Sequence, residues 1–225
     1  MTKCTDMENY IQDDSLNKTG VAPIRDTPDK KYKVGIAGIG MVGGAVKRYF
    51  EKKPNYELFL YDKEGVGSIE DLNKADYIYL CVPTPYVMGV GCDTSIVEEV
   101  VSKLEVKKIQ HYPVEDVNDI EEVGKVIIIK STVVPGTTQK LQEKFPQHKF
   151  LFNPEFLTEE TADQDMSFPD SQVIGYTDKS YNVAKEVLQQ LPLAPHERIV
   201  PSRIAEMIKY AKNTWFAVKV AKNNE

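Results

Sequence analysis

The chain has 225 residues, of which 41% are hydrophobic, and its formal net charge is −6 at pH 7. This length fits one globular domain, or one domain with part of another. The acidic balance argues against a broad nucleic-acid surface, and no apolar run reaches membrane-spanning length. The cysteines, Cys4, Cys81 and Cys92, lack metal-type or disulfide-type spacing, and the three histidines are scattered, so we expect a cytoplasmic protein without a metal site.

Residues 1–31 are polar and contain several glycine, proline and aspartate residues. This composition predicts a poorly ordered leader with at most one short helix, near residues 7–12. A plain tail is favoured over a regulatory segment.

The stretch from Lys33 to Asp62 has the order strand, glycine turn, helix, strand, acid. In such a turn Gly38 permits the tight bend, Gly40 lets a pyrophosphate approach the backbone, and Gly43 lets helix and strand pack closely. The helix start offers unpaired N–H groups to phosphates. Asp62 follows Gly43 by about 20 residues, where a carboxylate accepts the ribose hydroxyls of NAD and repels the extra phosphate of NADP. The stretch therefore predicts NAD binding.

Strands and helices continue to alternate after Asp62. We expect helices at 68–73 (capped by Ser68), 96–104, 138–145 and 178–191, and strands at 77–82, 126–129, 149–152 and 172–175. Residues 105–124 are predicted to form a loop and then a short solvated helix. This alternation predicts an α/β fold, a doubly wound parallel sheet of Rossmann type over residues 32–200.

Three polar motifs directly follow predicted strands: Pro83-Thr84-Pro85, Ser131-Thr132 and the segment from Asn153 to Glu159. In doubly wound sheets, ligands bind outside the carboxyl ends of the strands. We therefore expect these motifs to line one crevice.

A long connecting helix is predicted over residues 201–225, after the start signal Pro201-Ser202. Its apolar residues recur every three or four positions and form one stripe, which is expected to be the packing edge: Ile204, Ile208, Ala211, Trp215 and Val218. Glu206, Lys209 and Asn213 fall on the opposite side, which taken alone would usually be a solvated surface. The period also permits a partner helix, so this element is the expected homodimer contact.

Five segments together resemble the nucleotide-sugar dehydrogenases, above all the UDP-glucose 6-dehydrogenases: GIGMVGGA, VPTP, KSTVVPGT, NPEFLTEETA and AEMIKYAKNTWFAVKV. They occur in the family's order and span residues 32–225. Members of this family oxidise the C6 alcohol of a nucleotide sugar to a carboxylate in two NAD-dependent steps.

The resemblance implies roles for individual positions. The implied cofactor-binding residues are Gly38, Ile39, Gly40, Met41, Val42, Gly43, Asp62, Val82, Pro83, Thr84, Pro85, Ser131, Thr132 and Glu159. The implied substrate-binding residues are Glu155, Phe156, Leu157, Glu159, Lys209 and Asn213. The implied catalytic residues are Thr132, Glu155, Lys209 and Asn213. These residue types suit the chemistry, because an ammonium and an amide can stabilise the developing oxyanion and a carboxylate can remove a proton.

The sequence also departs from the family. The family's second step uses a cysteine in a GGxCFPKD segment, and its carboxyl-terminal domain binds UDP; neither is present in the sequence, and none of the three cysteines has the required context. The chain thus resembles an amino-terminal half, which we expect to bind NAD without completing turnover alone. Gly67 stands where relatives often carry a basic residue, a change that would weaken NAD binding.

Several alternatives stay open. The chain could be a non-catalytic NAD-binding or regulatory module, or one component of a split enzyme whose cysteine domain lies on a separate chain. Another β-hydroxyacid-type dehydrogenase is disfavoured by Glu155 and the KYAxN helix. UDP-glucose is the first expectation for the substrate, but enzymes acting on GDP-mannose or UDP-N-acetylmannosamine share these motifs. Neither a nucleic-acid nor a membrane partner is expected.

Overall fold

The computed structural model describes residues 30–89, 91–110 and 120–223. The predicted leader, its short helix and Cys4 lie outside the described residues. No helix in the described ranges is both long enough and apolar enough to cross a membrane.

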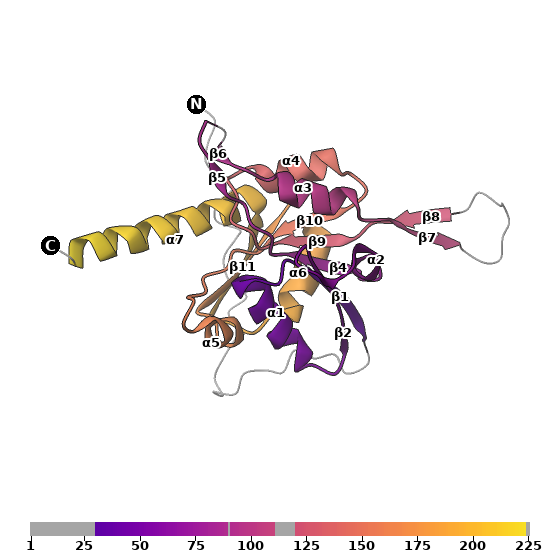
Figure 1. Ribbon diagram of the computed structural model, residues 1–225, viewed down its shortest axis with the longest axis horizontal. Helices are drawn as coiled ribbons and strands as arrows, with labels where there is room; N and C mark the ends of the chain where they lie inside the picture. Colours follow the sequence, from indigo (N-terminus) through magenta and orange to yellow (C-terminus); the bar gives the residue numbers. More distant parts are fainter. Residues whose placement is uncertain (1–29, 90, 111–119, 224–225) are drawn as a thin grey trace, which may run out of the picture.

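A central sheet of eight strands organises the described structure (Figure 1). Its members are β1 (Tyr32–Ala37), β2 (Tyr56–Asp62), β3 (Val66–Gly67), β4 (Tyr77–Leu80), β9 (Val126–Ile129), β10 (Lys149–Phe152), β11 (Ser171–Tyr176) and β12 (His196–Pro201). They lie in the order β12-β11-β10-β9-β4-β1-β2-β3. Two hairpins stand outside the sheet: β5 (Tyr86–Val87) with β6 (Gly91–Cys92), and β7 (Lys107–Gln110) with β8 (Ile120–Val123).

The predicted Rossmann-like sheet is confirmed, with one refinement. Strands β2, β1, β4, β9 and β10 are parallel, as their short runs of buried apolar residues predict. Strand β11 is antiparallel to β10, and β12 runs parallel to β11. The sheet is therefore mixed, and the start of β11 lies at the same edge as the carboxyl ends of the parallel strands.

Seven helices accompany the sheet in the described residues: α1 (Met41–Glu51), α2 (Ile69–Leu72), α3 (Ser95–Ser102), α4 (Thr137–Lys144), α5 (Ala162–Ser167), α6 (Tyr181–Gln190) and α7 (Ser202–Asn223). One face of the sheet packs against α2, α3, α4 and the first turns of α7, and the other packs against α1, α5 and α6. Along β9 the alternation is direct, because Ile127 and Ile129 enter the first core and Ile128 enters the second.

Helix α7 crosses the sheet face and then projects from the body of the molecule (Figure 1). Gly175 in β11 allows its close approach, because an added Cβ would lie 2.7 Å from the Cβ of Ala205. The expected packing edge of this helix is wrong for Ile204, which is 50% exposed, and for Trp215, which is 59% exposed, whereas Ile208 does pack against the core. The polar residues Glu206 and Lys209 are buried.

Glu206 explains why the polar edge faces inward. Its carboxylate accepts hydrogen bonds from the backbone N–H of Gly136 at 2.5 Å and of Thr138 at 2.8 Å, and from the Thr138 hydroxyl at 2.7 Å. These donors lie at the start of α4. The N-cap residue there is Gly136, which has no side chain that could accept their hydrogen bonds. The carboxylate of one helix therefore caps another, which satisfies N–H groups that would otherwise be buried and unpaired.

Other local predictions had mixed outcomes. The Ser68 cap is confirmed, since its hydroxyl accepts the N–H of Asp71 at 3.1 Å. The prediction of a solvated helix before residue 124 is wrong for residues 120–123. These residues form β8, which pairs with β7. Helix α5 and strand β12 were not predicted.

Candidate functional site

The glycine turn joins β1 to α1 at the carboxyl edge of the sheet. Gly38 has a φ of +88°, and its N–H donates to Tyr61 O at 2.9 Å. A Cβ at Gly43 would lie 1.8 Å from the carbonyl oxygen of Gly38, so only glycine fits there. A Cβ at Gly40 would meet nothing within 4 Å, and α1 begins there without a side-chain cap. The turn thus leaves open space and unpaired N–H groups together, which fits the diphosphate of a dinucleotide.

Asp62, at the end of the neighbouring strand β2, contacts the glycine turn. Its carboxylate accepts the N–H of Ile39 at 2.6 Å and that of Glu64 at 3.0 Å. These backbone hydrogen bonds, the one from Ile39 first, hold the pKa of the carboxyl below its ordinary value. An ionised carboxylate has further acceptor sites for ribose hydroxyls, so the residues present fit NAD.

The motifs that follow β4 and β9 are joined to one another. The Ser131 hydroxyl donates to Val82 O at 2.6 Å, and the Thr84 hydroxyl donates to Thr132 O at 2.6 Å. The Cys92 thiol, in β6, contacts the same Thr132 oxygen at 3.5 Å. The structure thus brings Val82 and Thr84 against Ser131 and Thr132, as the sequence predicted for one crevice, while Pro83 and Pro85 are exposed beside them.

A buried ion pair joins the loop after β10 to α7. The Lys209 ammonium donates to a Glu155 carboxylate oxygen and to the Glu155 carbonyl oxygen, both at 2.6 Å. The side chains are 7% and 12% exposed, respectively. The second carboxylate oxygen accepts the N–H of Leu157 at 2.9 Å. The two residues with the most specific implied chemistry therefore meet across 54 positions of sequence.

Phe156 lies beside this pair. Its ring centroid is 5.5 Å from the Lys209 ammonium and 3.8 Å from the Lys212 ammonium. Burial lowers the pKa of Lys212. Phe156 and Leu157 therefore belong to the same cluster as Glu155 and Lys209.

Two predicted residues lie apart from that cluster. Asn213 is exposed one helical turn beyond Lys209, and in the described structure no hydrogen bond joins its side chain to Glu155 or Lys209. Glu159 is also exposed and lines a shallow hollow with Arg48 of α1 and residues 160–164. The family resemblance placed both residues near the reacting centre. The described structure does not test either role, so both stay predictions.

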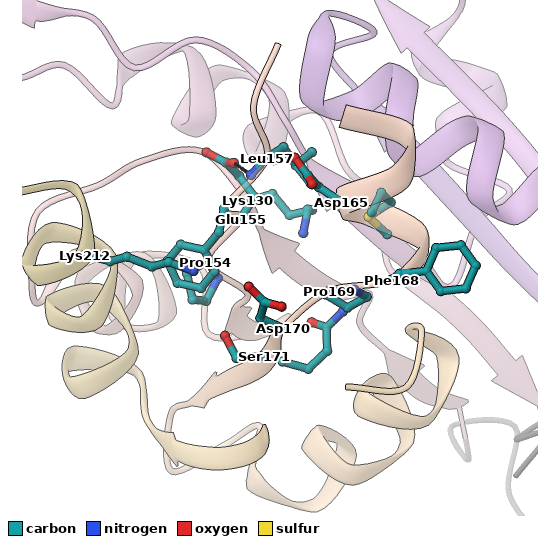
Figure 2. Close-up of a pocket in the computed structure, with 13 residues that line it drawn as sticks. Lys130, Pro154, Glu155, Leu157, Asp165, Phe168, Pro169, Asp170, Ser171 and Lys212 are labelled. Carbon is teal, nitrogen blue, oxygen red and sulfur yellow. Dashed lines mark hydrogen bonds between the residues drawn. The ribbon is translucent and has the colours of Figure 1, made fainter. Parts of the chain in front are cut away.

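A cleft of about 550 Å³, including its solvent-open part, lies between the Pro154–Leu157 loop, α5 and the start of β11 (Figure 2). Its floor includes two polar side chains that sequence reasoning missed, Lys130 and Gln172, and the buried Asn153 lies beside Lys130. The Lys130 ammonium donates to Asn153 Oδ1 at 2.7 Å. The available signal was that Lys130 and Asn153 each stand directly after a buried apolar strand.

The surroundings of Cys81 do not favour a reactive thiol. Cys81 follows β4, and burial raises the pKa of its thiol to about 12. A thiol so shifted is a poor nucleophile at neutral pH. No group of three or more potential metal-ligating side chains occurs within the described residues.

Comparisons with known proteins identify relatives. The family model for the NAD binding domain of the UDP-glucose/GDP-mannose dehydrogenase family matches residues 65–191. UDP-glucose 6-dehydrogenase of Rickettsia conorii is 32% identical over 165 residues, covering 69% of this chain and 34% of that protein. GDP-mannose 6-dehydrogenase of Pseudomonas aeruginosa is 28% identical over 191 residues, covering 77% of this chain and 41% of that protein.

Solved structures share the fold. A UDP-glucose dehydrogenase from Pyrobaculum islandicum superposes with a TM-score of 0.69 at 21% identity, covering 89% of this chain and 52% of that chain. A ternary complex of GDP-mannose dehydrogenase from Pseudomonas aeruginosa gives a TM-score of 0.65 at 23% identity, covering 85% and 51%. The chain spans 34% to 41% of the length of the two curated relatives named above.

Proposed function

The chain belongs to the UDP-glucose/GDP-mannose dehydrogenase family and carries its NAD-binding domain, and on this premise we propose that it serves the NAD-dependent oxidation of a nucleotide sugar. The observation that carries the proposal is the buried Glu155–Lys209 pair, which lies at the sheet edge where the cofactor motifs also gather.

The NAD site is proposed to be the glycine turn, Asp62 and the loops after β4 and β9. Bound NAD supplies the hydride acceptor. The turn between Gly38 and Gly43 would hold the diphosphate, and Asp62 would bind the adenosine ribose. The fixed loops that contain Thr84 and Thr132 would border the nicotinamide and exclude water from it. Glu159 is kept as a further cofactor contact.

The Glu155–Lys209 pair is proposed to handle the proton and the negative charge. Lys209 keeps a buried ammonium next to the position where an alkoxide develops, and this lowers the energy of that charge in a water-poor site. Glu155 is hydrogen-bonded to Lys209 and would accept the hydroxyl proton, directly or through water. Asn213 would add an amide donor, and Thr132 would help to position water for a later hydrolytic step.

UDP-glucose is the substrate that we propose first. The curated relatives also include GDP-mannose 6-dehydrogenases and a UDP-N-acetyl-D-mannosamine dehydrogenase at similar identity. The shared motifs concern the sugar's reacting carbon and the cofactor, not the base, so these two substrates are the alternatives to test.

A homodimer through α7 is part of the proposal. The exposed apolar residues of this helix include Ile204, Met207, Trp215, Phe216, Val218 and Val220. These residues leave a large apolar surface uncovered on a projecting helix, as expected for a subunit contact.

Sequential calorimetric titration tests the function. The protein is first saturated with NAD and then titrated with UDP-glucose, GDP-mannose and UDP-N-acetylmannosamine in parallel, while NADH absorbance is followed. We expect one nucleotide sugar to bind best. Lys209→Met should weaken that binding by about tenfold or more, because the cationic partner of the sugar oxygen is removed.

The matched control is Lys222→Met, which removes the same charge from an exposed position of the same helix. It should bind both ligands like the unmodified chain. Failure to bind NAD would contradict the dehydrogenase proposal, whereas binding of NAD with no response to any nucleotide sugar would favour a cofactor-binding module.

A further inference from the structure

The cleft beneath the Pro154–Leu157 loop contains a buried cation without a matching anion. Lys130 is 4% exposed. Among the described residues its ammonium makes one hydrogen bond, to Asn153 Oδ1, and no carboxylate lies within ion-pair distance. A buried charge of this kind is costly unless something pairs with it, so an unpaired one on a cleft floor indicates a ligand site.

The ammonium is held in place rather than free to withdraw. The Asn153 side chain that accepts from Lys130 also donates to Val173 O at 2.9 Å and to Gln172 Oε1 at 3.3 Å. Three adjacent strands therefore fix one polar row at the carboxyl edge of the sheet. One of the three ammonium hydrogens is used, which leaves two donors for a ligand.

The charges that line the cleft balance one another, but none of the lining carboxylates forms an ion pair with Lys130. Glu155 is paired with Lys209, and Asp165 accepts hydrogen bonds from the neutral groups of Thr158 and Thr161, so it keeps its negative charge. The carboxylates of Asp165 and Asp170 offset the ammonium groups of Lys130 and Lys212 in the lining as a whole. The two unused donors of Lys130 are therefore what suits the carboxylate of a ligand.

We propose that this cleft binds a small organic hydroxy acid, with its carboxylate on the Lys130 ammonium. Figure 2 shows Lys130 and Asp170 on opposite sides of the hollow, with Lys212 and Phe168 on its flanks. The exposed Asp170 carboxylate would accept a ligand hydroxyl, and Pro154, Leu157 and Met166 would cover the carbon skeleton. Burial lowers the pKa of Lys130, and a bound carboxylate would raise that pKa again.

Titration of the full chain with D-glucuronate, a hydroxy acid of suitable size, tests this site. D-glucose is the neutral control and inorganic phosphate is the alternative anion. We expect saturable binding of glucuronate, none of glucose, and a loss of about tenfold or more for Lys130→Met, which keeps the length of the side chain. Affinity should also fall at alkaline pH as Lys130 loses its proton.

Two further variants keep the test decisive. Lys212→Met changes the mouth of the cleft without touching its buried floor, and it should weaken glucuronate binding several-fold even if Lys130→Met folds poorly. Lys140→Met removes a charge from an exposed position on α4 and should bind like the parent. Equal losses in Lys140→Met, tighter binding of phosphate than of glucuronate, or no binding of glucuronate would each overturn the proposal. This cleft shares Glu155, Phe156 and Leu157 with the proposed substrate site, so NAD affinity is measured alongside. Loss of glucuronate binding with NAD binding intact would argue against this cleft alone.

Discussion

Gly40 and Gly43 stand three positions apart in one turn, yet the structure assigns them different tasks. Gly43 is required by packing, because its Cβ would overlap the Gly38 carbonyl oxygen, whereas Gly40 faces open space. Gly40→Leu should therefore keep the free energy of unfolding nearly unchanged and abolish measurable NAD binding. Gly43→Ala should lower the free energy of unfolding by about 3 kcal/mol through backbone displacement.

Urea unfolding and NAD titration of the same two variants check this separation. A destabilised Gly40→Leu that still binds NAD, or a Gly43→Ala as stable as the parent, would contradict the assignment.

His148 provides a pH dependence that belongs to a single side chain. It is fully buried, its Nδ1 accepts the N–H of Lys125 at 3.1 Å, and burial lowers its pKa to about 4. The unfolded chain binds the proton near pH 6.5, so stability is complete above that value and falls as the pH drops toward 4. The expected loss is at most about 3 kcal/mol.

The measurement is the free energy of unfolding across this pH range for the parent and for His148→Gln. The variant should be less stable at neutral pH and have a flatter slope between pH 6.5 and 4. Parallel slopes would show that other groups carry the pH dependence.

At the scale of elements, α7 shows what a hydrophobic pattern can and cannot predict. The sequence predicted a helix over residues 201–225, which the structure shows over Ser202–Asn223, and it separated the apolar stripe from the polar edge. It could not tell which edge meets the domain, because that depends on the partners: the start of α4 needs an acceptor, and Glu155 needs a cation. Glu206 and Lys209 answer those needs, so the polar edge is buried.

The same element gives a stability prediction. Glu206→Ala should lower the free energy of unfolding by about 3 kcal/mol, because it leaves buried N–H groups of Gly136 and Thr138 without an acceptor. Arg203→Ala, at an exposed position of the same helix, is the matched control and should change it by less than about 0.5 kcal/mol. Thermal or urea unfolding decides, and equal effects in the two variants would reject the capping role.

The parallel strands at the centre of the sheet could be predicted from their apolar runs. The runs at 126–129 and 149–152 are buried on both faces and bounded by polar loops, so pattern and structure coincide. The β7–β8 hairpin was missed because its charged residues are adjacent, Lys107-Lys108 and Glu121-Glu122, and do not show the alternation of a strand. Strand β12 was missed because half-buried edge strands carry a weaker apolar signal.

At the scale of the whole molecule, the distal part of α7 is the least covered surface. Trp215 and Phe216 are 59% and 52% exposed on a helix that projects from the body. We predict concentration-dependent self-association, which Trp215→Glu should weaken by about tenfold or more because it places a charge on the apolar face. Sedimentation velocity measures this, with Lys222→Glu as the control, and a parent chain that stays monomeric at high concentration would contradict it.

Some residues of the candidate site could be predicted from the sequence, and others were found only in the structure. Residue type and spacing predicted the glycine turn and Asp62. The family resemblance implied Glu155 and Lys209 one by one, and their contact with each other was not predicted. Lys130, Gln172 and Lys212 were missed because their significance comes from packing between three strands and a distant helix, which no local spacing encodes.

The most direct test of the account is a calorimetric comparison of NAD with NADP for the parent chain and for Asp62→Asn. We predict that the parent binds NAD and discriminates against NADP, and that Asp62→Asn weakens NAD binding by about tenfold and narrows that discrimination. A parent chain that binds neither dinucleotide, or binds NADP as tightly as NAD, would contradict the account.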